Sequence, residues 1–274
     1  MIRIIVLCTF VALMATQCHG AKILLAFPTP SKSHMIVASS LMKGLAAKGH
    51  KVTVMSAFPE EKPIENYRDV VIQGDEAIKE IIKDFAKEAG SQVNFFARFT
   101  DVIDQSLVSA NKSLHEEAWQ KVMREESFDL VVFGMFFSNF VMGLGDHFKC
   151  PVIGIFSGGV TEVINDMSGN PSAVASVPHM FQGRVPEMTF VNRVKAFFLN
   201  GVERVLWAYV EHREKIYYES NFPSPKYKTF DEMKRNVSLF FVNDHFSASS
   251  VRPLIPAVVE VGGLHIKSTP DPLP

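Results

Sequence analysis

The chain has 274 residues, a net charge of −1 and 47% apolar residues, enough apolar sequence for a substantial hydrophobic core. A charge this close to zero gives no reason to expect nucleic acid or an anionic membrane surface as a partner. Of the 3 cysteines, Cys8 and Cys18 lie within the first 20 residues. Cys150 is the one cysteine beyond residue 20. A chain from which those 20 residues are removed would have no internal disulfide, and we expect its fold to be stabilised by its core.

Residues 1–20 have the form of a signal peptide, with Arg3 near the start and an apolar run from Ile4 to Ala15. A membrane anchor is the alternative, but this run is shorter than the roughly 18–20 residues needed to span a bilayer. We therefore expect cleavage before Ala21 and entry into the secretory pathway. There the sequons at Asn111 and Asn236 become available for N-glycosylation.

The next segment predicts a strand–helix–strand unit. An apolar strand at 23–27 leads into a proline-containing turn at 28–32, and a helical pattern begins at Ser33. Gly49 is the predicted stop of that helix, and a second strand follows at 52–55. Such a crossover unit places its two strands parallel, with the helix packed on the sheet.

The same alternation continues along the chain. Further strands are predicted at 70–72, 128–133, 152–156, 238–243 and 258–261, helices at 75–89, 92–124, 138–148 and 187–220, and a loop rich in Pro, Gly and Ser at 165–186. Strands that alternate with helices predict one α/β domain with a doubly wound, mainly parallel sheet.

His34 is the strongest candidate for chemistry, because it falls in the first turn of the helix after the first strand. Ligands of doubly wound sheets bind beyond the carboxyl ends of the strands, where this turn lies. The helix dipole lowers the pKa of an imidazole there and favours its neutral form, which can act as a base. From position alone, a surface or capping histidine is the more common alternative.

Several chemistries find no support in the sequence. No Gly-x-Gly-x-x-Gly or Walker-type loop is present, so the usual backbone cradles for phosphate are missing. No spacing of Cys and His suits zinc, and we expect neither a metal nor a tightly bound cofactor. A Gly-x-Ser-x-Gly nucleophile elbow is also absent.

Two separate stretches carry a family resemblance. The segment 27–34, with Phe27-Pro28 and Ser33-His34, resembles the opening of the animal UDP-glycosyltransferases. The stretches 238–246, 252–256 and 260–265 resemble, in the same order, the end of that family's N-terminal half. The resemblance runs from about Lys22 to the last residue.

This resemblance implies a two-lobed enzyme of the GT-B type with paired Rossmann-like domains. Residues 21–266 would form the acceptor-binding lobe and 267–274 the start of the linker to a donor-binding lobe that this sequence does not contain. We expect the chain to be a fragment, inactive by itself, with UDP-sugar held mainly by the other lobe. The family also implies the lumen of the endoplasmic reticulum, a membrane-anchored full-length protein and a role in detoxification.

The activity implied is inverting transfer of a hexose, glucose or glucuronic acid, from UDP-sugar to a hydroxyl of a small lipophilic acceptor. His34 matches the family's base. The family's acid that orients this histidine has no counterpart, since Gly134 stands at the matching position. Asp129 lies at the opposite end of the strand, while Ser138 and Asn139 are within reach of the site but uncharged. The alternative is a non-catalytic lobe that binds a lipophile or a partner.

An apolar acceptor needs an apolar pocket, and the chain has 23 Phe. The candidate acceptor-binding residues are Ser33, Phe95, Phe96, Phe99, Phe136 and Phe137. Plain core packing is the alternative for each phenylalanine. The segment 191–206 mixes aromatic and basic residues, which suits either a helix resting on a membrane surface or an ordinary amphipathic helix.

Overall fold

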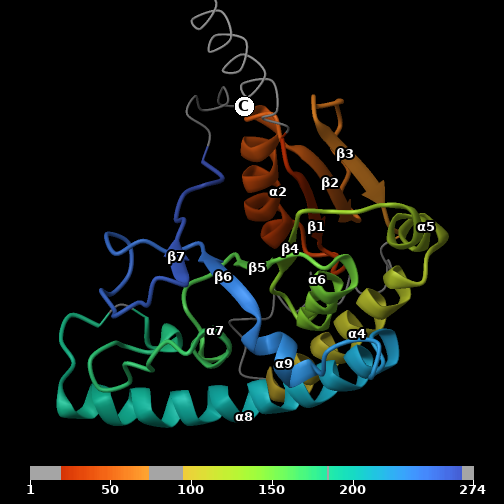
Figure 1. Cartoon of the computed structure of the whole chain (residues 1–274). Helices are drawn as coiled ribbons and strands as arrows, with labels where there is room; N and C mark the ends of the chain where they lie inside the picture. The colour runs from red at the N-terminus through yellow and green to blue at the C-terminus, as the bar shows by residue number, and fades with distance from the viewer. Residues whose placement is uncertain (1–19, 74–94, 184, 267–274) are drawn as a thin grey trace, which may run out of the picture.

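Seven parallel strands form one sheet in the order β3-β2-β1-β4-β5-β6-β7 (Figure 1). The computed structural model describes residues 20–73, 95–183 and 185–266, with the side chains of 95–98 left out. The strands are β1 (Lys22–Ala26), β2 (Lys51–Ser56), β3 (Tyr67–Val71), β4 (Leu130–Gly134), β5 (Val152–Phe156), β6 (Val237–Val242) and β7 (Val258–Glu260). Every pairing in the sheet is parallel, which confirms the predicted α/β class.

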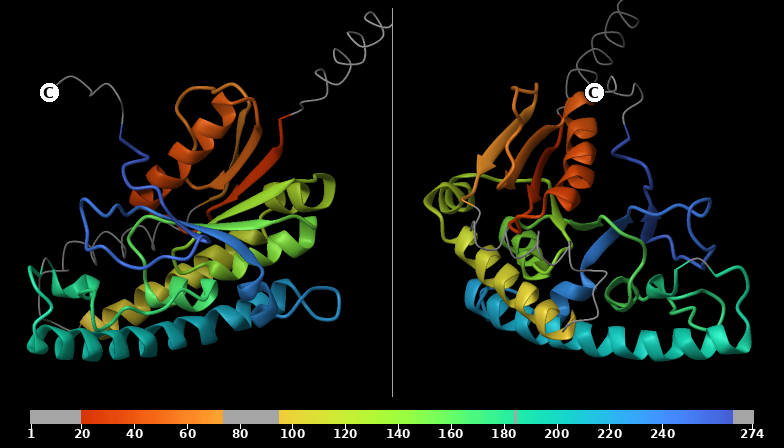
Figure 2. Two further views of the ribbon diagram at one scale, coloured as in Figure 1. Left: turned by 60° about the vertical axis from the view of Figure 1, so that its left-hand side comes forward. Right: turned by 180° about the vertical axis from the view of Figure 1, so that it is seen from behind.

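Helices cover both faces of this sheet. They are α2 (Lys32–Ala47), α4 (Phe95–Leu114), α5 (Glu117–Glu125), α6 (Gly143–Phe148), α7 (Glu162–Ser168), α8 (Phe190–Asn221) and α9 (Phe230–Arg235), with short 3-10 turns η1 (Asn139–Met142) and η2 (Met180–Gln182). In Figure 2, α2 packs on one face, while α4 and α8 run side by side on the other.

The central strand β1 shows why both faces need cover. Ile23 and Leu25 point into the core that α2 closes, whereas Leu24 and Ala26 point into the larger core beneath α4 and α8. Successive side chains of a strand face opposite sides of a sheet, so a strand buried on both sides reads as a continuous apolar run. The apolar run at 23–27 is therefore typical of a central parallel strand.

The order of the strands reverses direction at β1, which has β2 on one side and β4 on the other. At such a switch point, the loops leaving the two central strands diverge to opposite faces and open a crevice. The segments leaving β1 and β4 are Phe27–Ser31 and Met135–Ser138. The topology therefore places both loops at the carboxyl ends of the strands, where they border this crevice.

Three predicted segments differ from the structure. The single helix expected at 92–124 is two helices, because the chain bends after Leu114 and the backbone carbonyl of Glu116 accepts from Trp119 to start α5. The segment at 138–148 begins as the 3-10 turn η1 and becomes α6 only at Gly143. The expected loop at 165–186 contains most of α7 and all of η2.

A further helix was not predicted, and some predicted segments cannot be compared with the structure. α9 spans only six residues and is held by a capping box in which Thr229 and Glu232 bond each other's backbone N–H groups. The helix expected at 75–89 lies outside the described residues, as does the signal-peptide segment at 1–19. Within the described ranges, no helix combines the length and apolar character that crossing a bilayer requires.

Candidate functional site

His34 lies in the first turn of α2, held by two hydroxyl groups. The Oγ atom of Ser31, the residue before the helix, lies 2.8 Å from His34 Nδ1, and the Oγ atom of Ser33 lies 3.3 Å from it. Ser31 is buried, with 3% of its surface exposed, whereas Ser33 is exposed. The Nδ1 edge of the imidazole therefore faces the start of its own helix.

Two phenylalanine rings lie close to the imidazole. The Phe136 ring lies with its centroid 4.0 Å from that of His34, and the Phe156 ring at 6.3 Å. Burial lowers the pKa of His34 from 6.5 to about 4, because a desolvated imidazolium is penalised. The sequence predicted a lowered pKa through the helix dipole, but the cause found in the structure is desolvation. The imidazole is neutral at physiological pH.

A cavity of about 150 Å³ opens beside His34 and has an almost entirely apolar lining. Its walls come from α2, α4, the β4–η1 loop, the end of β5, the start of α7, η2 and α8. The lining residues are His34, Phe99, Met135, Phe136, Phe137, Phe156, Thr161, Met180, Phe181, Glu203, Leu206, Trp207 and Val210. This lining suits a small lipophilic molecule with one polar group directed at the imidazole.

Three of the candidate acceptor-binding residues, Phe99, Phe136 and Phe137, line this cavity. Ser33 does not line it, and its exposed side chain contacts His34 instead. Phe95 begins α4 and Phe96 follows it, but their side chains lie outside the described part of the structure.

The β4–η1 loop, Met135–Ser138, holds its rings in a constrained backbone. Phe137 has φ of 49°, in the left-handed region that bulky residues rarely adopt. Its ring packs edge-on against Phe99 with centroids 5.7 Å apart and lies 6.0 Å from Trp207. The Thr29 hydroxyl donates to the Phe136 carbonyl at 3.0 Å, which fixes this loop to the segment that carries His34.

Gly134, where the family's orienting acid would stand, has no room for a side chain. A Cβ atom built on Gly134 would overlap the ring of Phe27, which is 2% exposed. Asp129 accepts a hydrogen bond from the backbone N–H of Lys22 at 2.8 Å, at the opposite edge of the sheet. Neither position supplies a carboxylate to His34.

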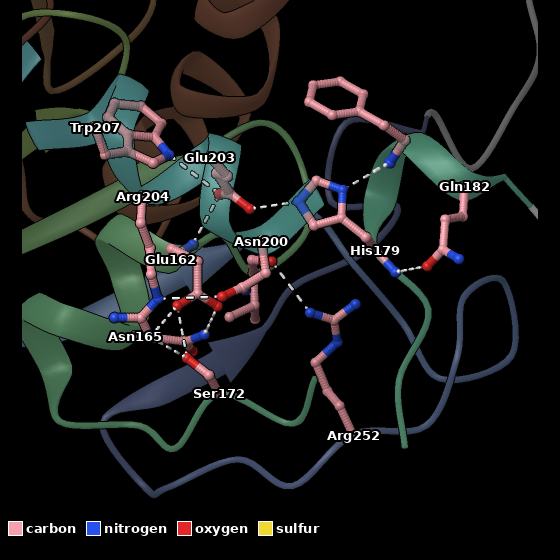
Figure 3. A network of polar contacts seen from close by, with 12 residues as sticks. Glu162, Asn165, Ser172, His179, Gln182, Asn200, Glu203, Arg204, Trp207 and Arg252 are labelled. Atoms are coloured by element: carbon pink, nitrogen blue, oxygen red, sulfur yellow. Dashed lines mark hydrogen bonds and ion pairs between the residues drawn. The ribbon is translucent and has the colours of Figure 1, made fainter. Parts of the chain in front are cut away.

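Glu203 is the one carboxylate among the described residues that line the cavity, and its oxygens accept hydrogen bonds from groups other than His34 (Figure 3). Oε2 lies 2.7 Å from His179 Nε2, and Oε1 accepts from the Glu162 backbone N–H at 2.9 Å and from Trp207 Nε1 at 3.1 Å. His179 Nδ1 accepts from the backbone N–H of Phe181, so the ring must be neutral and must donate to Glu203 through Nε2.

A second buried carboxylate, Glu162, extends this network into the loop after α7 (Figure 3). It accepts from Asn165 at 3.0 Å and from Ser172 at 2.6 Å, and it pairs with Arg204 at 2.6 Å. Although burial opposes ionisation, hydrogen bonds from Ser172, Asn200 and Asn165 and the charge of Arg204 leave the pKa of Glu162 below its ordinary value. The network ties α7, Ser172 and His179 to α8, and thereby shapes two walls of the cavity.

Ser138 and Asn139, the uncharged residues considered as substitutes for the acid, are both buried, and Asn139 contacts a different carboxylate. The backbone N–H of Asn139 donates to Glu214 Oε1 at 2.7 Å in the interior. Burial raises the pKa of Glu214 to about 8, and the Asn139 hydrogen bond only partly opposes this shift. Among the described residues, the hydrogen-bond and ring contacts of His34 are with Ser31, Ser33, Phe136 and Phe156 rather than with these two side chains.

Sequence reasoning missed the polar groups that hold this site: Ser31, Thr29, Glu203 and Glu214. Ser31 gave a signal, since a serine before a helix usually bonds the backbone N–H of the third helical residue, which here is His34. The two glutamates sit at positions 203 and 214 of a helix whose other buried residues include Ala196, Val210 and Tyr218. They fall on the buried stripe of α8, although a carboxylate by itself predicts exposure.

The two sequons lie in different surroundings. Asn111 is inside α4, where its Oδ1 accepts from Asn221 at 2.7 Å and Ser113 is buried. Asn236 ends α9, and both it and Ser238 are exposed. Asn236 is thus the accessible sequon of the folded lobe.

No group of His, Cys, Asp and Glu suited to a metal ion occurs among the described residues. Cys150 is half-buried and unpaired, and burial raises the pKa of its thiol to about 11. It is therefore a poor nucleophile at neutral pH.

The fold and this site define a doubly wound α/β lobe with an apolar half-site beside a desolvated histidine. Residues 21–274 match the UDPGT family, UDP-glucoronosyl and UDP-glucosyl transferase. The chain belongs to this family.

Similar proteins carry related names. UDP-glucosyltransferase 2 of Dactylopius coccus is 30% identical over 99% of this chain and 52% of its own length. UDP-glucuronosyltransferase 3A1 of Bos taurus is 24% identical over 86% of this chain and 46% of its length. Among solved structures, the calicheamicin glycosyltransferase CalG4 matches with TM-score 0.48 and 16% identity, over 89% of this chain and 53% of that chain. The chain spans about half the length of the curated relatives it matches.

Proposed function

We propose that this chain is the acceptor-binding half of a UDP-glycosyltransferase that transfers a hexose to a hydroxyl of a small lipophilic acceptor. The observation that carries the proposal is a neutral, desolvated His34 facing an apolar cavity at the switch point of the sheet. Membership of the family supports UDP-sugar as the donor class, and we propose glucose or glucuronic acid as the hexose.

The site supports the following chemistry. His34 takes the proton of the acceptor hydroxyl as its oxygen forms a bond to the anomeric carbon, and the bond from that carbon to the UDP oxygen breaks. UDP leaves with the bonding electron pair, and attack from the opposite side inverts the configuration. A hydroxyl is a poor nucleophile until a positioned base accepts its proton in the transition state, which typically contributes about 10²–10⁴-fold in rate.

The acceptor would be positioned by the cavity. Its apolar body would lie against Phe99, Phe136 and Trp207, with its hydroxyl toward the imidazole. Thr161 adds one polar handle, since its buried Oγ1 has no partner in the described part of the chain. UDP-sugar would be bound mainly from the other side of the cleft, because the β1–α2 turn offers Pro28 and Pro30, which lack N–H groups.

The alternative function is a non-catalytic lobe that binds a lipophile or a protein partner, and the missing carboxylate at Gly134 favours it. Both functions use the apolar cavity, so binding of a phenol or alcohol does not separate them. Sugar transfer does. In a two-lobed protein that contains this lobe, His34→Ala should lower kcat by about 10²-fold or more and leave acceptor affinity nearly unchanged.

The control for that measurement is His115→Ala, which changes an exposed histidine directly after α4. A wild-type protein that binds acceptor but releases no UDP would support the non-catalytic lobe. A His34→Ala variant with kcat within about threefold of wild type would remove His34 from the role of base.

We also propose that the chain works in the secretory pathway with α8 against a membrane surface. Between 190 and 205, the exposed face of this helix is apolar, with Phe190, Val191, Val194, Phe197, Phe198, Val202 and Val205 all more than a third exposed. The charged residues of this stretch are Arg193, Lys195, Arg204 and Glu203, and the glutamate is the buried one. An apolar face with exposed cations suits an anionic lipid surface.

A further inference from the structure

We propose that Ser31 is the positioning residue for His34, and that its hydroxyl takes the place of the absent carboxylate by accepting the Nδ1–H of the imidazole. The inference deepens the proposed function, on which its catalytic meaning rests. It concerns which ring nitrogen carries the proton, since a base must present its lone pair to the acceptor.

The first observation is an unused cap. Ser31 precedes α2, and a serine there ordinarily accepts from a backbone N–H of the first turn. In this helix the Ser31 side chain makes no capping hydrogen bond, and its Oγ lies instead 2.8 Å from His34 Nδ1. The Ser31 hydroxyl therefore bonds the side chain of the third helical residue instead of a backbone N–H group.

The second observation is the pair of oxygens around one nitrogen. Ser31 Oγ at 2.8 Å and Ser33 Oγ at 3.3 Å both approach His34 Nδ1. One N–H can donate to two oxygens in a three-centre bond, which is common at helix ends, whereas a single in-plane lone pair accepts one O–H well. This geometry favours the tautomer with the proton on Nδ1.

The third observation is the opposite edge of the ring. His34 Nε2 has no hydrogen-bond partner among the described residues, and the ring lines the apolar cavity. With the proton on Nδ1, the Nε2 lone pair is free for an acceptor hydroxyl. With the proton on Nε2, that nitrogen could only donate to the acceptor hydroxyl, and the lone pair would lie on Nδ1, which faces Ser31 and Ser33.

The fourth observation is that the Glu203 carboxylate, which lines the same cavity, is not available to orient His34. The two Glu203 oxygens already accept from His179, the Glu162 backbone and Trp207.

The two serines differ in burial, since Ser31 is 3% exposed and Ser33 is open to solvent. Water can replace the Ser33 oxygen but not the Ser31 oxygen, which makes Ser33 the matched control.

The test is the ¹⁵N NMR spectrum of the chain labelled at histidine, recorded near neutral pH. His34 is assigned by the signals lost in His34→Gln. We expect a protonated, pyrrole-type Nδ1 and an unprotonated, pyridine-type Nε2. Ser31→Ala should move both nitrogens toward the averaged shifts of a mixed tautomer, Ser31→Thr should restore them, and Ser33→Ala should leave them unchanged.

A pyridine-type Nδ1 in the wild-type chain, or shifts unaffected by Ser31→Ala, would overturn the inference. Because the Ser31 hydroxyl caps no backbone N–H, Ser31→Ala should fold and melt close to Ser33→Ala. In a two-lobed protein with transferase activity, Ser31→Ala should lower kcat about 10- to 100-fold without changing the acceptor KM. The NMR result stands whether or not His34→Ala affects transfer, so failure of the tautomer and failure of the proposed function are distinguishable.

Discussion

The rings of His34 and Phe136 lie 4.0 Å apart between centroids, tilted by 39°. This contact joins the first turn of α2 to the loop that leaves β4, and the Thr29 hydroxyl, which donates to the Phe136 carbonyl, ties the loop that leaves β1 to the same residue. The ring that packs on the histidine consequently comes from a residue about a hundred positions away in the sequence. Four predictions follow from this and from other contacts of the lobe.

Removing the Phe136 ring should raise the pKa of His34. Phe136→Ala lets water reach the imidazole, so its pKa should move from about 4 toward 6.5 in an NMR titration of the chain. The folded pKa lies below the unfolded one, so the stability linked to this group is present above pH 6.5 and is lost as pH falls through about 4. Phe148→Ala, which removes a ring packed on Phe128 and His147, is the control. An unchanged pKa in Phe136→Ala would show that this ring does not desolvate His34.

Gly134 should not tolerate the acid that the family places there. The sequence alone predicts that Gly134→Asp would raise activity by orienting His34, but the new Cβ would overlap the buried ring of Phe27. We expect both Gly134→Ala and Gly134→Asp to lower the free energy of unfolding by about 1–3 kcal/mol, as overpacking does. Denaturant unfolding measures this effect.

A double-mutant cycle identifies the cause. In a Phe27→Leu background, Gly134→Ala should cost less than in the wild type, with a coupling of at least about 0.5 kcal/mol. Equal costs in both backgrounds would mean that Phe27 is not the obstacle. An active, stable Gly134→Asp would mean that the strand places its side chain away from Phe27.

Glu214 should make the lobe less stable as pH rises. Its folded pKa of about 8 lies above the ordinary 4.5, so the folded state holds a proton that the unfolded state releases between these values. The contribution is fully present below pH 4.5 and is lost as pH rises to about 8, in total on the order of 4–5 kcal/mol. Glu214→Gln, which can still accept from the Asn139 N–H, should flatten the dependence of unfolding free energy on pH.

Glu219→Gln is the control on the same helix, because Glu219 is exposed and is not among the groups that shift the Glu214 pKa. A Glu214→Gln variant with the same slope as the wild type would assign the pH dependence to other groups.

The apolar face of α8 should bind anionic vesicles. Phe197 and Phe198 are 68% and 66% exposed, and Phe197→Ser or Phe198→Ser should reduce sedimentation of the chain with phosphatidylserine-containing vesicles. Ile216→Ser is the matched control, since Ile216 is 50% exposed but lies in the mixed-charge half of the helix. Equal losses in both variants would contradict a membrane role, as would a concentration-dependent dimer that covers the face.

Much of the fold was predictable from local pattern. The apolar run at 23–27 and the runs near 130 and 152 became central strands within one or two residues, because burial on both faces leaves an unbroken apolar signal. The position of His34 beyond β1 followed from the crossover unit alone. α9 could also have been found, since Thr229 and Glu232 have the spacing of a capping box.

What the sequence could not show were the pairings between distant segments. No local pattern places the Phe27 ring over Gly134, 107 positions away. The burial of Glu203 and Glu214 also depends on partners far along the chain, His179 and the Asn139 backbone. A carboxylate on a helix reads as solvent-facing until those partners are known.

The segregation of roles around the cavity has an evolutionary consequence. His34 lies in the first turn of α2, whereas Met180 and Phe181 belong to η2, a short turn anchored by the His179 hydrogen bonds and more than half exposed at both residues. Substitutions in η2 can therefore change the shape presented to incoming molecules without disturbing the imidazole or the sheet beneath it. A lineage that must handle new compounds could diversify η2 and keep the reactive group constant, and a protein engineer could begin a library at the same two positions.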